Sequence, residues 1–288
     1  MYRTLLVPLD GSALGEGALP TAATLAQRMG ARVVLVRVVD DASPSTVHTA
    51  QHYLESVRAR LPSGVPVETH VSHGPAATGI LDAIFNSRAD LVIMTTHGRG
   101  GLRRLVYGSV AAKVLVASPA PVWLVPVRGT PYPPLLSKSS AQVLAVLDGS
   151  LFAEAALAHT TALARVLGGS VLLLRVVPPQ PLLVDPMIAE TLSPEADDEQ
   201  AAEVYLRNVA STLTHEGISV HTVFRTGSPA QAILDEIWSS GADVLVIATH
   251  GRSGIDRTLL GSVAQAVIHA CAIPMLVVRP HHSNGGEN

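Results

Sequence analysis

Two segments of the sequence place glycine and serine at a spacing suited to holding a phosphate group. In the first, His97-Gly98 is followed after nine residues by Gly108-Ser109. In the second, His250-Gly251 is followed after nine residues by Gly261-Ser262. Glycine lets backbone N–H groups approach an anion closely, and the helix predicted after each second glycine adds unsatisfied donors at its N-terminus. The repeated spacing favours two phosphate-binding loops over two simple turns.

A carboxylate follows the first apolar run of each half. Asp10 comes directly after Leu5–Leu9, and Asp148 occupies the equivalent place 138 residues later. An acid at this point either turns the chain into a helix, because helix starts favour acids, or faces a nucleotide or its metal ion. The sequence leaves both interpretations open.

Other kinds of chemistry lack their residues. The sequence has no G-x-x-x-x-G-K-[ST] loop, no G-x-S-x-G turn and no cysteine–histidine group with zinc spacing. We therefore assign no catalytic residue and no metal ligand, and we expect His97 and His250 to hold turns. Both lysines, Lys113 and Lys138, lie outside the glycine loops, so positive charge near a phosphate must come from a metal or from Arg99, Arg103, Arg104, Arg252 and Arg257.

Composition predicts a soluble, cytoplasmic protein. The net charge of −3 and the lack of clustered basic residues argue against a nucleic-acid partner. No apolar run reaches the roughly 18 residues of a membrane span, and the N-terminus lacks the features of a signal peptide. The single cysteine, Cys271, excludes an internal disulfide and is expected in the core.

The chain is one unit written twice. Val7 to Ser12 reappears as Ala145 to Ser150, and Thr96 to Arg99 reappears as Thr249 to Arg252. The offset grows from 138 to 153 residues, so the second copy carries 15 extra residues after Val177. This proline-rich stretch, up to the acidic residues 197–199, is predicted to be a loop. We place the first domain at 1–128, a linker at 129–141 and the second domain at 142–280.

Within each copy, apolar runs alternate with helical patterns. The runs in the first copy are Leu5–Leu9, Val33–Val39, Val65–Val71, Leu91–Met94 and Val122–Val127. Such β-branched runs are typical of strands buried on both faces, hence of a parallel sheet covered by helices. Leu14, Ala18, Ala22, Leu25 and Met29 fit one face of a single helix, for which Ser12 is a natural N-cap, as Ser150 is for its twin. The pattern predicts α/β architecture with two doubly wound parallel sheets, related by an approximate two-fold axis.

At these loops each copy resembles a universal stress protein domain, and the whole chain resembles a tandem bacterial member of that family. The family's nucleotide motif is glycine, two residues, glycine, nine residues, glycine, and serine or threonine. Here Gly98, Gly108 and Ser109 match in the first copy, and Gly251, Gly261 and Ser262 match in the second. The first glycine is replaced by Thr95 in one copy and Ala248 in the other. Because threonine adds a branched side chain, we expect the first site to be the more crowded.

The resemblance implies a Rossmann-like, adenine-nucleotide α-hydrolase-like fold with five strands in each domain and pairing of the domains through their last strands, Pro121–Val127 and Pro274–Arg279. It implies ATP as ligand, alone or with Mg²⁺, and a backbone contact to adenine at Val38 and Val176. The nucleotide-binding residues expected in the first copy are Pro8, Leu9, Asp10, Val38, Met94, Thr95, Gly98, Arg99, Gly108, Ser109 and Val110. Those expected in the second copy are Val146, Leu147, Asp148, Val176, Ile247, Ala248, Gly251, Arg252, Gly261, Ser262 and Val263.

Three functions are consistent with these observations. The first is an ATP-binding stress-response protein that acts as a nucleotide-dependent sensor or switch. The second is a dimerisation or interaction module of the same fold without nucleotide, since one branch of the family lacks the motif. The third is a slow ATPase, because the loops supply no evident general base beyond Asp10 and Asp148. Beyond the internal domain pair, a homodimer is left open.

Overall fold

A computed structural model of the chain describes residues 2–96, 108–127, 140–179, 194–249 and 260–279. The first copy alternates strands and helices in the order β1 (Thr4–Pro8), α1 (Ala13–Glu16), α2 (Leu19–Met29), β2 (Arg32–Val39), α3 (Pro44–Arg58), β3 (Val67–His73), α4 (Ala76–Ser87), β4 (Leu91–Thr95), α5 (Ser109–Ala117) and β5 (Val122–Val125). The five predicted strands are present, and β3 begins two residues later than its apolar run.

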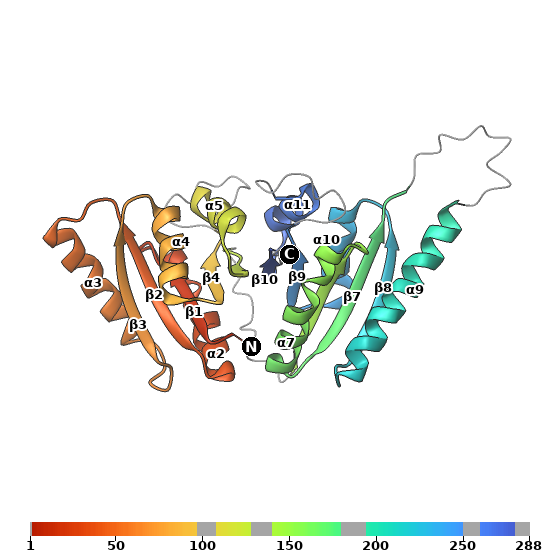
Figure 1. The fold of residues 1–288 in the computed structure, drawn as a ribbon, viewed down its shortest axis with the longest axis horizontal. Helices are drawn as coiled ribbons and strands as arrows, with labels where there is room; N and C mark the ends of the chain where they lie inside the picture. Colours follow the sequence, from red (N-terminus) through yellow and green to blue (C-terminus); the bar gives the residue numbers. More distant parts are fainter. Residues whose placement is uncertain (1, 97–107, 128–139, 180–193, 250–259, 280–288) are drawn as a thin grey trace, which may run out of the picture.

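The second copy repeats this order. Its elements are β6 (Gln142–Leu147), α6 (Leu151–Glu154), α7 (Leu157–Leu167), β7 (Ser170–Val177), α9 (Pro194–His215), β8 (Val220–Thr226), α10 (Pro229–Ser240), β9 (Val244–Ala248), α11 (Ser262–Ala270) and β10 (Met275–Val278). Figure 1 shows the two copies side by side, with α5 and α11 close to each other at the centre.

Within each copy the strands are parallel and the helices cover both faces. The sheet order is β3-β2-β1-β4-β5-β10-β9-β6-β7-β8. One core cluster contains Leu25 of α2 and Leu54 of α3, and a second contains Ile84 of α4 and Leu115 of α5. The α/β class and the tandem repeat are therefore confirmed, and buried Cys271 lies in the core as expected.

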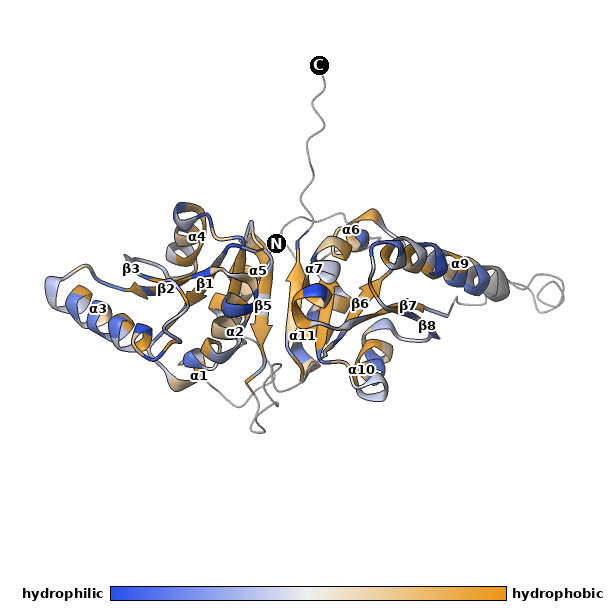
Figure 2. Ribbon diagram, turned by 90° about the horizontal axis from the view of Figure 1, so that it is seen from below, coloured by the Kyte–Doolittle hydropathy of each residue, from blue (hydrophilic) through white to orange (hydrophobic). Residues whose placement is uncertain are grey.

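The expected pair of sheets is joined into one sheet of ten strands. β5 and β10 pair antiparallel, with Trp123 opposite Leu276, so the last strand of one copy hydrogen-bonds to the last strand of the other. Figure 2 shows the two strands side by side in the middle of the molecule, both strongly hydrophobic. The resemblance implied this pairing, and its physical basis is the backbone groups that two end strands would otherwise leave unpaired.

The single helix predicted from Leu14 to Met29 is two helices. α1 ends at Glu16 and α2 begins at Leu19, and Leu14 is 39% exposed instead of lying in the core. Ser12 caps α1 as predicted, by accepting a hydrogen bond from the backbone N–H of Gly15. The apolar stripe continues across the break, which is why periodicity alone does not reveal it.

Two further expectations are corrected. The acidic residues 197–199 lie inside α9, which begins at Pro194, and not in a loop. Proline is favourable at the start of a helix and acids are favourable in its first turn, so these residues suit a helix start as well as a loop.

The expectation that every strand is buried on both faces is also corrected for β3. It alternates between half-buried and exposed residues because it is an edge strand.

We predict that the leucines of the helices near the site differ sharply in their contribution to stability. Leu163 of α7 is 0% exposed, whereas Leu151 at the start of α6 is 83% exposed. Leu163→Ala should lower the free energy of unfolding by about 2–5 kcal/mol, because it leaves a cavity. Leu151→Ala is the matched control and should change it by less than about 0.5 kcal/mol. Urea unfolding followed by circular dichroism measures both, and equal losses would contradict the described core.

Candidate functional site

A crevice opens where β6 and β9 separate. β6 pairs with β9 only as far as Ala145 opposite Val246, whereas it pairs with β7 up to Leu147 opposite Arg175. The first copy shows the same separation, since β1 pairs with β4 as far as Leu6 but with β2 as far as Pro8. In doubly wound sheets this point, where the strand order reverses, is where ligands bind.

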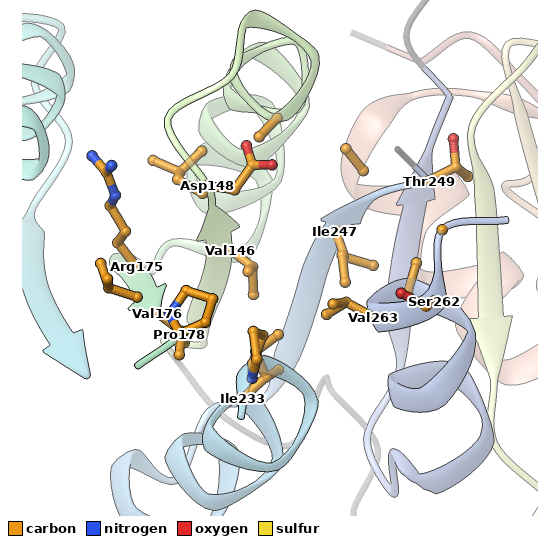
Figure 3. A pocket seen from close by; sticks show the side chains of 17 residues that line it. Val146, Asp148, Arg175, Val176, Pro178, Ile233, Ile247, Thr249, Ser262 and Val263 are labelled. Atoms are coloured by element: carbon orange, nitrogen blue, oxygen red, sulfur yellow. The ribbon is translucent and has the colours of Figure 1, made fainter. Parts of the chain in front are cut away.

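In the second copy this crevice holds a cavity of about 370 Å³. That volume is in the range of small-molecule sites. Its lining includes the predicted residues Val146, Leu147, Asp148, Val176, Ile247, Ala248, Gly261, Ser262 and Val263. These residues come from three strand ends and the start of α11, and Figure 3 shows the side chains of Val146, Val176, Ile247 and Val263 around the same space.

The cavity also contains residues that sequence reasoning missed: Ala153, Arg175, Val177, Pro178, Pro229, Ile233, Thr249 and Ala264. Most extend the apolar wall, and Pro229 and Ile233 bring in the start of α10. Their positions were visible in the sequence, since they lie within or directly beside the predicted strands and helices that surround the crevice. Apolar residues there also have a simple core interpretation, so type alone does not single them out.

The start of α11 has the geometry of an anion-binding helix N-terminus. Gly261 is the N-cap with φ −58° and ψ 146°, and Gly108 of α5 is its counterpart with φ −58° and ψ 148°. These angles are open to any residue, so the backbone does not require glycine. Among the described residues, the atom nearest to a Cβ added at Gly108 would be the Thr96 carbonyl oxygen, at 3.8 Å. Glycine therefore adds no side chain at the point where an anion would approach the start of the helix.

Asp10 and Asp148 shape the turn that leads from the first strand to the first helix of each copy. The Oδ1 atom of Asp148 accepts hydrogen bonds from the Ser150 backbone N–H at 2.9 Å and its hydroxyl at 2.6 Å. Asp10 accepts the same two bonds from Ser12, at 2.9 and 2.6 Å. The turn-forming interpretation of this acid therefore holds. Asp148 also lines the cavity, so its carboxyl group is held at a fixed place at the site.

Thr95 and Ala248, which replace the first glycine of the motif, have complementary neighbours. A Cβ added to Gly17 would lie 3.5 Å from the Cγ2 methyl of Thr95. The equivalents in the second copy are Ala155 and Ala248. Thr95 therefore lies beside a glycine, whereas the smaller Ala248 has an alanine at the equivalent place. The expectation that Thr95 crowds the first site stays a prediction.

Beside the site, each copy has an arginine that lies over a tyrosine ring. The Arg175 guanidinium of β7 lies 4.9 Å from the Tyr205 ring centre, and Arg37 of β2 lies 4.9 Å from that of Tyr53. Figure 3 shows Arg175 extending away from the neighbouring Val176, as alternation along a strand requires. The Tyr53 hydroxyl donates to Glu16 at 2.9 Å. The sequence signal was the recurrence of Arg37 as Arg175 at the offset of 138 residues.

Burial raises the pKa of both tyrosines. Burial is the larger cause, and the adjacent Glu16 carboxylate raises the pKa of Tyr53 further, as Glu154 does for Tyr205. A raised pKa means that each phenol is held in its neutral form. These residues therefore support the first helix of each copy, and offer the site no anionic tyrosine.

Several predicted residues lie outside the described part of the chain. Those predicted to bind nucleotide are Gly98, Arg99, Gly251 and Arg252, and His97, His250 and residues 129–139 of the predicted linker lie there too. The described first-copy residues occupy the equivalent places on β1, β2, β4 and the start of α5: Pro8, Leu9, Asp10, Val38, Met94, Thr95, Gly108, Ser109 and Val110. Among the described residues, no group of three or more histidine, cysteine or acidic side chains could hold a metal ion. Nor does any helix there have the length and apolarity to cross a membrane.

Comparison with known proteins assigns the fold to a family. The sequence profile described as "Universal stress protein family" matches residues 1–126 and 141–279. The chain belongs to the universal stress protein family. A universal stress protein of Mycolicibacterium smegmatis is 27% identical over 298 aligned positions, which cover 96% of this chain and 97% of the relative. The match spans both halves and nearly all of both chains, so this universal stress protein has a relative of similar length.

Shorter relatives and solved structures agree with this assignment. A Thermus aquaticus universal stress protein is 34% identical over 136 residues, which cover 43% of this chain and 99% of the relative. The crystal structure of an Archaeoglobus fulgidus universal stress protein covers 96% of both chains with a TM-score of 0.72 and 20% identity. At that identity the likeness shows the fold of the tandem chain and not its ligand.

We predict that this universal stress protein loses stability as pH rises above about 10, the pKa of an unfolded tyrosine. The buried tyrosines have higher pKa values when folded, so the unfolded chain releases its protons first and is favoured. Tyr53→Phe should reduce the loss of unfolding free energy between about pH 8 and about pH 10.5. Urea unfolding at both pH values gives this slope, and an unchanged slope in the variant would contradict the raised pKa of Tyr53.

Proposed function

We propose that this universal stress protein binds ATP in the crevice of each copy and acts as a nucleotide-dependent sensor or switch in a stress response. The observation that carries the proposal is that nine predicted residues, from four separate stretches of sequence, line one cavity. Their chemistry suits a nucleotide, since apolar walls lie beside a carboxylate and a helix N-terminus that favours anions.

The proposed roles follow the chemistry of each wall. Val146, Val176 and Ile247 would contact the adenine ring and the ribose, whose faces are largely apolar. Gly261 and Ser262 would bind phosphate through backbone N–H groups and the serine hydroxyl. Asp148 would accept hydrogen bonds from the ribose or hold a Mg²⁺ ion that neutralises the phosphates. Val38, Asp10 and Gly108 would take the equivalent roles in the first copy.

Other parts of the proposal concern organisation. We place the domains at 1–128 and 142–280, paired with each other through β5 and β10 as an internal counterpart of a dimer. We also propose that the protein works in the cytoplasm. An alternative is an interaction module without nucleotide, which the replacement of the first motif glycine by Thr95 and Ala248 favours. Slow ATP hydrolysis is a third candidate function.

The test of the proposal begins with the purified protein. Denaturation followed by mass spectrometry should release an adenine nucleotide, and calorimetric titration of nucleotide-free protein with ATP should give saturable binding. If the folded protein releases no nucleotide and also gives no binding signal with ATP, the interaction module is favoured. Appearance of ADP in the titrated sample over time would instead identify a slow ATPase.

We predict that Gly261→Val and Gly108→Val each weaken ATP binding at their own site while the fold is retained. The β-branched side chain would fill the space through which phosphate reaches the backbone, and a tenfold loss of affinity corresponds to about 1.4 kcal/mol. We expect about tenfold or more. Gly64→Val is the matched control, because a Cβ there meets no described atom within 4 Å and Gly64 precedes β3, at the opposite end of the parallel strands from the site. Unchanged affinity in both folded variants would contradict the phosphate assignment.

A further inference from the structure

The junction between the two halves has unlike residues at its centre. Trp123 of β5 pairs with Leu276 of β10. The two also occupy equivalent positions in the repeat, because they are 153 residues apart, as Gly108 and Gly261 are. The local two-fold axis that relates the end strands therefore passes between a tryptophan and a leucine. A junction between two identical halves would place the same residue on both sides of the axis.

The size difference is concentrated in this one pair. Trp123 and Leu276 are both 0% exposed and belong to the same core cluster, so their side chains share one face of the sheet. The flanking pairs, Val122 with Val277 and Leu124 with Met275, lie in the other core cluster. Each flanking pair joins side chains of similar size. The fit of the junction therefore depends mainly on its centre.

Trp123 carries a polar N–H group whose burial at this place is unfavourable. Among the described residues, its indole Nε1 has no hydrogen-bond partner although the atom is buried. Burying an unpaired donor is unfavourable, and a leucine at this position would avoid it. What the indole contributes is volume, which fills space beside the smaller Leu276.

We propose that the Trp123–Leu276 pair makes the end strand of each half selective for the unlike half. Two first halves would bring two indoles together at the axis and overfill the core. Two second halves would bring two leucines together and leave a cavity. The unlike pair avoids both faults, so the partner that each end strand fits best is the other half of the tandem chain. This selectivity does not depend on whether a nucleotide binds.

A double-mutant cycle on the full chain tests the proposal. Trp123→Leu gives two leucines, Leu276→Trp gives two tryptophans, and the double exchange restores one of each. Each single variant should lower the urea midpoint of unfolding by about 0.5–1 M, whereas the exchange should lie closer to the parent than either single variant. In the control pair, Leu124→Met and Met275→Leu, the two small changes should add.

The outcome that overturns the proposal is additivity at the centre. If the double exchange loses as much stability as the two single changes combined, or more, Trp123 and Leu276 are ordinary core residues without complementary sizes. Should Leu276→Trp fail to fold, Leu276→Phe combined with Trp123→Leu repeats the cycle with a smaller ring. Recovery in that pair supports the proposal, and additive loss again overturns it.

Discussion

The site depends on how the central strand of each copy pairs with its two parallel neighbours. Its pairing with one neighbour stops before its pairing with the other. β6 stays paired with β7 to its end but leaves β9 after Ala145, and β1 treats β2 and β4 in the same way. Helices from the two strands then run to opposite faces of the sheet. The topology therefore produces a crevice between these helices, and the side chains at the strand ends determine what the crevice can bind.

The lining could largely be predicted from the sequence, because strand ends and glycine loops are local features. Asp148 follows a strand, Val176 lies at the end of one and Gly261 precedes a helix, and all three line the cavity. The recurrence of Arg37 as Arg175 was visible in the sequence, but the stacking of Arg175 on Tyr205 was not predictable, because it joins β7 to α9 across a stretch whose length differs between the copies. Such contacts depend on how distant elements pack, which periodicity does not encode.

Two details of the fold were predicted wrongly, also for local reasons. The break between α1 and α2 was missed because the apolar stripe is continuous across Gly17, and the acids near Pro194 were assigned to a loop because proline and acids also begin helices. The copies have diverged in contacting pairs as well. A Cβ on Gly15 would lie 2.6 Å from the Asp10 Oδ1 atom, yet the equivalent residue is Ala153. The second copy thus has a methyl group where the first has none, although both aspartates accept the same serine bonds.

The joined sheet also determines which strand edges water and other proteins meet. The most apolar end strands, β5 and β10, cover each other, and every residue of β10 is buried. The edges that remain are β3 and β8, with sequences VETHVSH and VHTVFRT. Histidine, glutamate and arginine on an outer strand discourage the edge-to-edge stacking that leads to aggregates. Because the two domains are joined through their most apolar end strands, the long sheet ends in two strands that are poorly suited to fibril growth.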